Sequence, residues 1–415
     1  MERRQFTFIL IAVLVVLFIW NPFSRKRDQK VPPPRVTREE AQAMADYMEN
    51  STVPPEEYLA GMFRDRDVVF IGEGTKIKEH VEFIRDVIPY LYDAGVRNLG
   101  MEHVLADDQS AVDRLLTSLY FDEQNARELL RRRYAMWGFQ EYIGIFEAAW
   151  ELNAELSEDQ RPFRIVGLAV RHDWTVLETE KQLKDPEIKR RILTYGLPST
   201  FMADTIQREI MEPGEKALVF CSLAQSFTRY RNKQYEESAR EEGYEEVRGA
   251  GNIIHDRIGS RAATAYLHLF WPDTKSQYGV AFAVGGIIDA ALSLLPEDQR
   301  RAGFDTRGNP ASDTPIKEGI YAYEYEDLTM KDIYDGYLVF GPLHEYRPAT
   351  PIPDFFTPEN VEETLVNFPA PKERLPAIEK LETQEDLERA AEELNSLLDG
   401  EAQNTTRFLQ MFDYT

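Results

Sequence analysis

Residues 67–116 constrain the fold more than any other stretch, because they alternate twice between a short apolar run and a helical pattern. The first run, 68–71, ends in Gly72-Glu73-Gly74, and the second, 98–101, ends in Glu102-His103. This alternation is typical of βαβ units, which build parallel sheets. Ligands bind beyond the carboxyl ends of the strands in such sheets. We therefore expect Glu73 and Glu102 to lie side by side on adjacent strands, at the edge where such folds do their chemistry.

The same pattern continues along the chain. Further apolar runs lie at 163–170, 217–223, 262–271, 278–284 and 337–340. A helical insertion over 123–133 and 140–156 separates the second run from the third. The sequence predicts an α/β fold with a mostly parallel central sheet flanked by helices.

The N-terminus carries an almost wholly apolar run over residues 6–20, with Arg3 and Arg4 before it. The run is shorter than the ~20 residues of an ideal spanning helix and also suits a signal peptide. Bulky residues follow it, without a small-x-small cleavage site, so we expect an uncleaved single-pass anchor through which the protein contacts the membrane. A signal peptide cut at an atypical site is the alternative.

Proline, charge and helix signals divide the remainder. A basic, proline-containing tether follows the anchor, and Thr37 is the predicted N-cap of a helix to about Glu49. The acidic segment after Pro348 is expected to be helical and to pack weakly, or to serve as a surface appendage. The predicted organisation is a transmembrane anchor or uncleaved signal at 1–23, a linker and helix at 24–64, the α/β domain at 65–345 and an acidic helical tail at 346–415.

Charge and cysteine content exclude some functions. The formal net charge of -24 argues against nucleic acid as a partner, because its phosphates must be neutralised by Lys and Arg. The single cysteine, Cys221, excludes an internal disulfide. Paired cysteines, H-E-x-x-H and zinc-finger spacings are absent from the sequence. The GxxxxGK[ST] and GxGxxG spacings of nucleotide-binding loops also fail after Glu73.

The two strand-end glutamates are the leading candidates for chemistry. Paired carboxylates can divide acid and base roles, or hold a divalent metal. His103 sits at a strand end and His80 in the first turn of the following helix, so both are candidates for the same cleft. Successive strand residues point to opposite faces, which sets Glu102 and His103 apart. Arg171 follows the third strand and could orient an anionic group; a loop ion pair is the alternative.

Other polar groups are expected to have structural roles. His268 is expected to be a satisfied core or surface histidine and not a ligand. The arginines at 131–133 are expected to be favourable charges at a helix C-terminus, with anion binding as the alternative. Hydroxyl and amide groups at 222–226 follow the fourth strand and could donate hydrogen bonds, although the G-x-S-x-G elbow is absent.

At this point the sequence resembles the superfamily that contains the ChaN haem-binding lipoproteins, the Tiki metalloproteases and the erythromycin esterases. The resemblance covers roughly 65–345 and rests on short pieces in a shared order. These pieces are Val69-Phe70-Ile71-Gly72-Glu73, Glu79-His80, Gly95 through Glu102, Ala106-Asp107-Asp108-Gln109, Ile165-Val166-Gly167-Leu168, Met202-Ala203-Asp204-Thr205-Ile206, 216–223 and Asp335-Gly336-Tyr337-Leu338-Val339-Phe340.

The resemblance implies that Glu73 and Glu102 are the family's glutamates and that His80 matches the ChaN-like histidine. Two histidines of the family pattern are replaced, by Lys76 and by Gln225. A membrane-anchored hydrolase acting on a small molecule or peptide is the first hypothesis. A degenerate haem-binding or small-ligand-binding protein of the same fold is the second. A divalent metal and haem both stay open as cofactors.

Orientation across the membrane has two readings. More Lys and Arg follow the apolar run than precede it, which favours a cytoplasmic domain. The family resemblance instead implies the extracytoplasmic side, which is the expectation carried forward.

Overall fold

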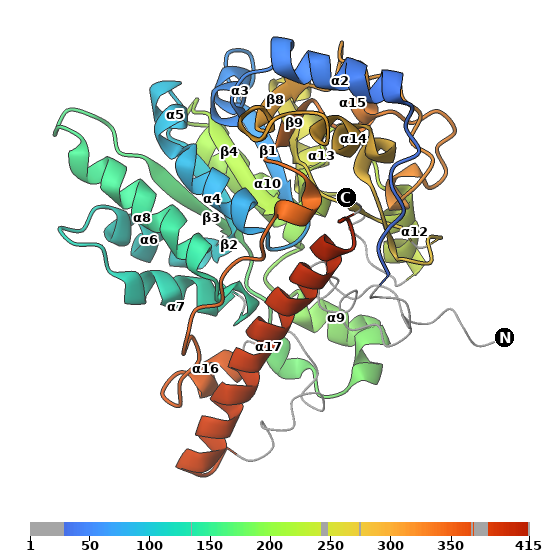
Figure 1. Ribbon diagram of the computed structural model, residues 1–415. Coiled ribbons are helices and arrows are strands. Elements are labelled where there is room, and N and C mark those ends of the chain that lie inside the picture. Colours follow the sequence, from blue (N-terminus) through green and yellow to red (C-terminus); the bar gives the residue numbers. More distant parts are fainter. Residues whose placement is uncertain are drawn as a thin grey trace.

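A seven-stranded sheet forms the centre of the computed structural model, which describes residues 29–133, 135–241, 248–273, 275–366, 368 and 381–413 (Figure 1). Its strands run in the order β3-β2-β4-β1-β5-β9-β8, and all neighbours are parallel except β8 and β9. The bounds are β1 Val68–Glu73, β2 Asn98–Leu105, β3 Arg164–Ala169, β4 Ala217–Ser222, β5 Ala262–Leu267, β8 Ala302–Asp305 and β9 Gly336–Val339. The predicted α/β fold with a mostly parallel sheet is confirmed.

The strand order corrects one prediction. β1 and β2 are not neighbours, because β4 lies between them and pairs in parallel with both. Glu73 is in register with Ser222 of β4. Two parallel strands on either side of a third lie about 9–10 Å apart. Glu73 and Glu102 therefore share an edge of the sheet without being side by side.

Two helical layers cover the sheet, and the alternation of side chains along each strand divides the core between them. Val69 and Ile71 of β1 join the larger core, while Val68 and Phe70 join the smaller core on the opposite face. The larger core takes side chains from α4 Lys78–Asp86, α5 Ile88–Asp93, α6 Gln109–Leu116, α7 Glu123–Arg133 and α8 Gln140–Glu155. The smaller core takes them from α10 Pro198–Ile206 and α13 Ala250–Ile258.

Several local predictions can be compared with the structure. Thr37 caps α2 with a complete capping box, as predicted. The helical pattern between the first two strands forms two helices, α4 and α5. Pro89 in the first turn of α5 explains the break, because proline lacks the N–H that a helix interior needs. The predicted run 262–271 forms β5 and begins β6 Trp271–Pro272. The run 278–284 contains β7 Val280–Ala281, which pairs with β6 as an antiparallel ladder of two residues per strand. The remaining α-helices are α2 Arg38–Ser51, α3 Pro55–Met62, α9 Pro186–Ile192, α11 Leu223–Ser226, α12 Lys233–Glu241, α14 Ile287–Leu292, α15 Met330–Ile333, α16 Val361–Val366 and α17 Gln384–Gln410.

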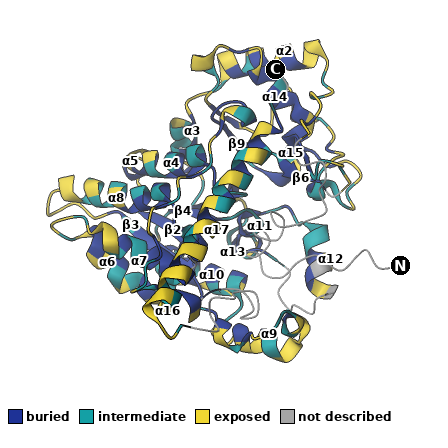
Figure 2. Ribbon diagram, turned by 60° about the horizontal axis from the view of Figure 1, so that its bottom comes forward, coloured by how far each residue is buried: buried dark blue, intermediate teal, exposed yellow. Residues whose placement is uncertain are grey.

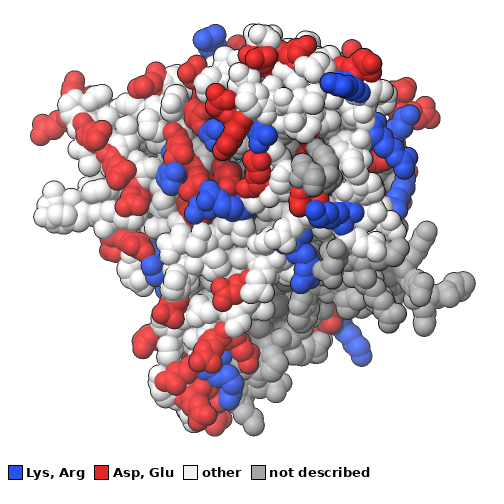
Figure 3. Space-filling view, in the orientation of Figure 1, with Lys and Arg blue, Asp and Glu red and all other residues white. Residues whose placement is uncertain are grey.

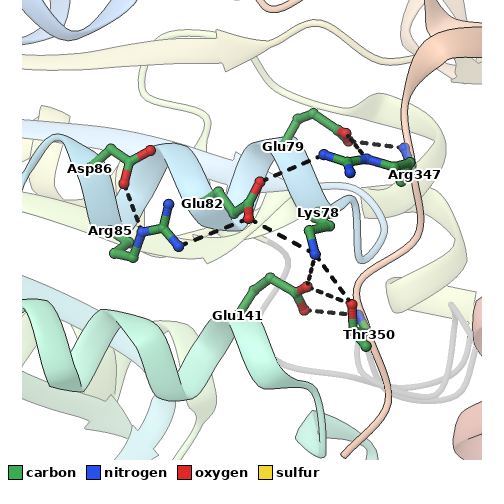
Figure 4. A network of polar contacts seen from close by, with 8 residues as sticks. All are labelled: Lys78, Glu79, Glu82, Arg85, Asp86, Glu141, Arg347 and Thr350. Carbon is green, nitrogen blue, oxygen red and sulfur yellow. Dashed lines mark hydrogen bonds and ion pairs between the residues drawn. The ribbon is translucent and has the colours of Figure 1, made fainter.

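The chain after β9 is tied to the domain before it reaches its last helix. Figure 4 shows Arg347 bonded to Glu79 of α4, with Nε 2.8 Å from Oε1. The backbone N–H and hydroxyl of Thr350 each donate to Glu141 of α8, at 2.8 Å, and Lys78 reaches the same carboxylate at 3.1 Å. These contacts fasten the segment to two helices of one layer.

The acidic C-terminal segment is part of the packed domain, so the expectation of a weakly packed appendage is wrong. The helix α17 crosses the front of the molecule in Figure 1 and buries one side while exposing the other in Figure 2. Leu394 and Leu398 are buried members of the larger core, and Glu401 and Thr405 are buried as well. The hydrophobic positions of α17 recur on one face of the helix, which is the pattern of a helix that packs.

The predicted membrane anchor lies outside the described residues. Among those that are described, no helix is both long and apolar enough to cross a bilayer. Acidic side chains are spread over most of the face in Figure 3 and are interspersed with basic ones.

Candidate functional site

Glu73, His103 and Tyr142 meet in a buried polar cluster at the carboxyl edge of the sheet. His103 Nε2 lies 3.1 Å from Glu73 Oε2, and the Tyr142 hydroxyl donates to Glu73 Oε1. His103 is 1% exposed, Glu73 is 7% exposed and Tyr142 is 0% exposed, so water is largely excluded from the cluster. Burial, followed by the nearby Glu73 charge, raises the pKa of Tyr142 well above its usual value. Tyr142 is therefore a neutral donor to the carboxylate.

The alternation of the strands explains why these side chains face one another. Glu73 lies an even number of residues beyond Val69 and Ile71, and His103 lies two residues beyond Met101, so both point to the face of the larger core. Phe220 of the intervening β4 lies on the same face, with its ring stacked on His103 at a centroid distance of 4.7 Å. Trp137 packs edge-on against the other side of the imidazole at 4.4 Å. This aromatic enclosure holds His103 in place.

Lys76 and Glu401 form a second buried pair beside this cluster. The Lys76 ammonium bonds Glu401 Oε1 on α17, and the two side chains are only 6% and 4% exposed. The ammonium also lies over the Trp137 ring, 4.6 Å from its centroid, and 5.5 Å from that of Phe139. Burial raises the pKa of Glu401, with a smaller contribution from Glu73, while Lys76 acts in the opposite direction. The replaced histidine of the family pattern is thus a charged residue within the site.

Glu102 has a different environment from that of His103. Its Oε2 accepts a hydrogen bond of 2.7 Å from the backbone N–H of Ser222, where β4 ends. Its Oε1 lies 3.9 Å from the Arg133 guanidinium, which also donates to the Glu102 carbonyl. The expected separation of Glu102 from His103 is confirmed. Glu102 secures the ends of two strands rather than forming a carboxylate pair with Glu73.

His80 and Arg171, the other two predicted site residues, lie apart from the cluster. His80 Nε2 bonds the His268 carbonyl at 3.1 Å, and its ring packs on Phe340 and Tyr346. Burial lowers the pKa of His80 to about 3, so the residue is a neutral core group. Arg171 is partly buried and pairs with Asp107 at 3.4 Å, which is the loop ion pair given as its alternative.

Other candidates have structural partners. His268 is fully buried between the Tyr337 hydroxyl, at 2.9 Å from Nδ1, and Asp289, at 3.3 Å from Nε2, as expected of a core histidine. Gln225 accepts a hydrogen bond from the N–H of Ala250 at the start of α13. The second missing family histidine is therefore replaced by a residue that joins α11 to α13.

The donor groups at the site do not fit a resident metal or haem. Within the described ranges, no group of three His, Cys, Asp or Glu side chains is placed to hold a metal ion. An axial haem ligand needs an accessible nitrogen, yet the rings of His103 and His80 are both 1% exposed, with Nε2 bonded and Nδ1 buried. Among the described residues, the site therefore offers no ligand set for either of the two cofactors that the sequence left open, a divalent metal and haem.

Tyr142, Trp137 and Glu401 are site residues that sequence reasoning missed. Tyr142 and Trp137 come from the helical insertion between β2 and β3, and Glu401 comes from the tail. One signal was available, because the residues around Tyr142 read as an apolar helix face that had to cover the sheet. The sequence held no comparable signal for Glu401, one of many acids on an amphipathic helix.

Comparisons with known proteins agree with this fold. Residues 59–226 match the family described as "Haem-binding uptake, Tiki superfamily, ChaN". A solved succinoglycan biosynthesis protein is 12% identical, with a TM-score of 0.53 over 76% of this chain and 99% of its own. A Bacillus cereus protein is 11% identical, with a TM-score of 0.48 over 75% of this chain and 99% of its own.

An erythromycin esterase in its open conformation is 12% identical, with a TM-score of 0.42 over 68% of this chain and 92% of its own. No curated protein matches the sequence significantly. The matched residues 59–226 contain β1, β2, β4, Glu73, His103 and Tyr142, and leave out α17. The predicted resemblance to the ChaN and Tiki superfamily is thus confirmed over residues 59–226.

Proposed function

We propose that the protein is a hydrolase in which Glu73 and His103 form a base dyad that activates water against an ester or amide carbonyl. The observation that carries the proposal is the contact of 3.1 Å between Glu73 Oε2 and His103 Nε2, in a site from which water is largely excluded. A carboxylate that orients an imidazole is the arrangement that recurs in hydrolytic bases. The fold and family relate the chain to esterase-like hydrolases and haem-uptake proteins.

The hydrogen bonds assign a role to each nitrogen of His103. The Glu73 carboxylate only accepts, so the proton of the neutral imidazole sits on Nε2. Nδ1 then carries the lone pair, and among the described residues it has no hydrogen-bond partner. Nδ1 is the atom that takes a proton from the attacking water. Glu73 stabilises the imidazolium that results.

Tyr142 and Lys76 complete the proposed machinery. Tyr142 holds the second oxygen of Glu73 and so fixes the direction of the carboxylate. Lys76 places a positive charge beside the dyad in a largely dry site, where such a charge attracts an anionic group of a substrate far better than it would in water. Glu102 is a positioning residue, because it acts through the backbone of Ser222. This replaces the idea of two paired glutamates.

Substitutions at the dyad test the proposal. A panel of p-nitrophenyl esters and fluorogenic peptides is assayed with wild type, Glu73→Gln and His103→Gln, and with Glu393→Gln as an exposed acid-to-amide control. We expect kcat/KM to fall by about 10²–10⁴ in both dyad variants and to stay unchanged in the control. Full hydrolysis by folded Glu73→Gln protein would refute the assignment.

The second hypothesis, a non-catalytic ligand carrier, predicts a different result. A carrier has no turnover in wild type and retains a ligand that can be extracted after purification. Haem titration distinguishes the haem version through a Soret band. We expect no band, because His80 and His103 have their Nε2 atoms occupied and their rings buried.

We also propose that residues 1–23 anchor the domain to a membrane, on the extracytoplasmic side. The support is the apolar run at 6–20 and the family resemblance. Protease treatment of intact and permeabilised cells tests the orientation: digestion of the domain in intact cells is expected, and protection until permeabilisation would contradict it.

A further inference from the structure

The buried ammonium of Lys76 has an unusual partner. Its position three residues after Glu73 places it in the loop that leaves β1, inside the part of the chain that matches the family. Its carboxylate partner, Glu401, comes from α17, outside that part. A lysine charge is almost never buried unless it is paired. The site therefore needs an anion at Lys76, and α17 provides one.

Glu401 satisfies Lys76 incompletely. Its Oε1 bonds the ammonium, but its Oε2 is buried without a hydrogen-bond partner among the described residues. Such a group costs free energy comparable to a lost hydrogen bond, and more when it is charged. Glu73 also destabilises the negative charge of Glu401. A purely structural ion pair would be expected to have better-satisfied oxygens, so Glu401 resembles an occupant of the subsite more than a component of it.

The walls around Lys76 indicate what accompanies the anion. Trp137 and Phe139 present their rings to the ammonium at 4.6 and 5.5 Å. His103 lies against the same Trp137 ring. A ligand bound here therefore meets one positive charge, two aromatic faces and the proposed base. That combination suits an organic carboxylate with an apolar or aromatic body.

We propose that Lys76 is the subsite for a substrate carboxylate, and that Glu401 occupies this subsite when α17 is docked. The substrate carboxylate replaces Glu401 on Lys76, and α17 moves away to admit it. The inference deepens the proposed function and rests on it only for the identity of the bound molecule as a substrate. No covalent step is involved.

Binding can be measured without turnover. The probe is 3-phenylpropanoate, and its neutral analogue 3-phenylpropanamide reports binding to the aromatic walls alone. Isothermal titration is carried out on the full chain as wild type, Glu401→Gln, Glu401→Gln with Lys76→Gln, and the exposed control Glu393→Gln from the same helix. Circular dichroism checks that each variant is folded.

We expect Glu401→Gln to bind 3-phenylpropanoate at least tenfold more tightly than wild type and the Glu393→Gln control, because the competing carboxylate is gone. The gain should disappear when Lys76→Gln is added, and the amide should show no gain. Equal affinity in wild type and Glu401→Gln would overturn the proposal, as would an equal gain for the amide. N-acetylphenylalanine, tested beside its amide, distinguishes a peptide C-terminus from a free small acid.

A second variant keeps the proposal testable if Glu401→Gln does not fold. The hydroxyls of Thr75 and Thr405 lie 3.4 Å apart, so these two side chains face one another and are the positions for an engineered disulfide between the β1 loop and α17. In the Thr75→Cys, Thr405→Cys protein, oxidation should abolish binding of 3-phenylpropanoate and reduction should restore it. Equal binding in both states would refute displacement of α17.

The two proposals fail separately. If the dyad is wrong, esters are not hydrolysed, yet the binding pattern persists, and the same pattern is expected in a His103→Gln background. If the subsite is wrong, binding does not respond to Glu401, while the effect of Glu73→Gln on hydrolysis stands.

Discussion

Replacing Tyr142 by phenylalanine isolates one hydrogen bond of the site. The Tyr142 side chain is fully buried and its hydroxyl donates to Glu73 Oε1, so phenylalanine fills the same space and removes only the donor. A hydrogen bond to a charged group contributes about 1.5–3 kcal/mol to stability. We expect the free energy of unfolding to fall by about 1.5–3 kcal/mol. Urea unfolding at neutral pH, followed by circular dichroism, measures this difference.

The matched control is Tyr337→Phe, another fully buried tyrosine. Its hydroxyl lies 2.9 Å from the imidazole Nδ1 of His268 and not from a carboxylate, so the expected loss is only about 0.5–1.5 kcal/mol. Only Tyr142→Phe should also lower kcat/KM for ester hydrolysis, because it frees one oxygen of Glu73. If Tyr142→Phe costs no more than Tyr337→Phe, the argument that Tyr142 serves a buried carboxylate is refuted.

Three further predictions concern stability. Burial lowers the pKa of His80 from 6.5 to about 3, so below pH 6.5 the unfolded chain takes up a proton that the folded chain does not. The free energy of unfolding should therefore fall by about 1.4 kcal/mol for each pH unit below about 6.5. His80→Gln should reduce the slope of unfolding free energy against pH by that amount. Gly72→Ala should destabilise by about 1–3 kcal/mol, since its Cβ would lie 2.7 Å from Leu223 Cα, whereas Gly61→Ala meets no atom within 4 Å and should be neutral or stabilising in thermal unfolding. Lys76→Met and Glu401→Leu should each cost about 3–5 kcal/mol in urea unfolding while the double variant returns near wild type; additive losses would contradict a coupled buried pair.

Local sequence patterns predicted the helices and strands well, but they predicted the order of the strands in the sheet less well. Hydrophobic periodicity found the strands and the helical insertion, and the capping signal at Thr37 placed the start of α2. Strand order was wrong at one decisive point, because β4 pairs between β1 and β2. Pairing between segments so distant in sequence depends on packing of both sheet faces, which no local pattern contains.

The candidate site was predicted in part for the same reason. Period-two alternation separated Glu102 from His103 correctly, yet the partner of Glu73 is His103 and not Glu102. His80 was expected near the cleft, but the face of α4 that carries it packs toward β5 and β9. Glu401 lies beyond any motif, since its role arises only from where the amphipathic α17 docks.

The strand order also decides when the site can form during synthesis. β1 and β2 leave the ribosome early, but neither can complete its pairing until β4 follows, and Glu73 cannot meet His103 across β4 before then. α17 follows every strand of the sheet in the sequence, so Lys76 cannot pair with Glu401 until all of the strands have been synthesised. Such long-range closure is slow and leaves apolar strands unpaired in the meantime. A nascent chain that stops before α17 would thus present an open, charged subsite on an otherwise assembled sheet.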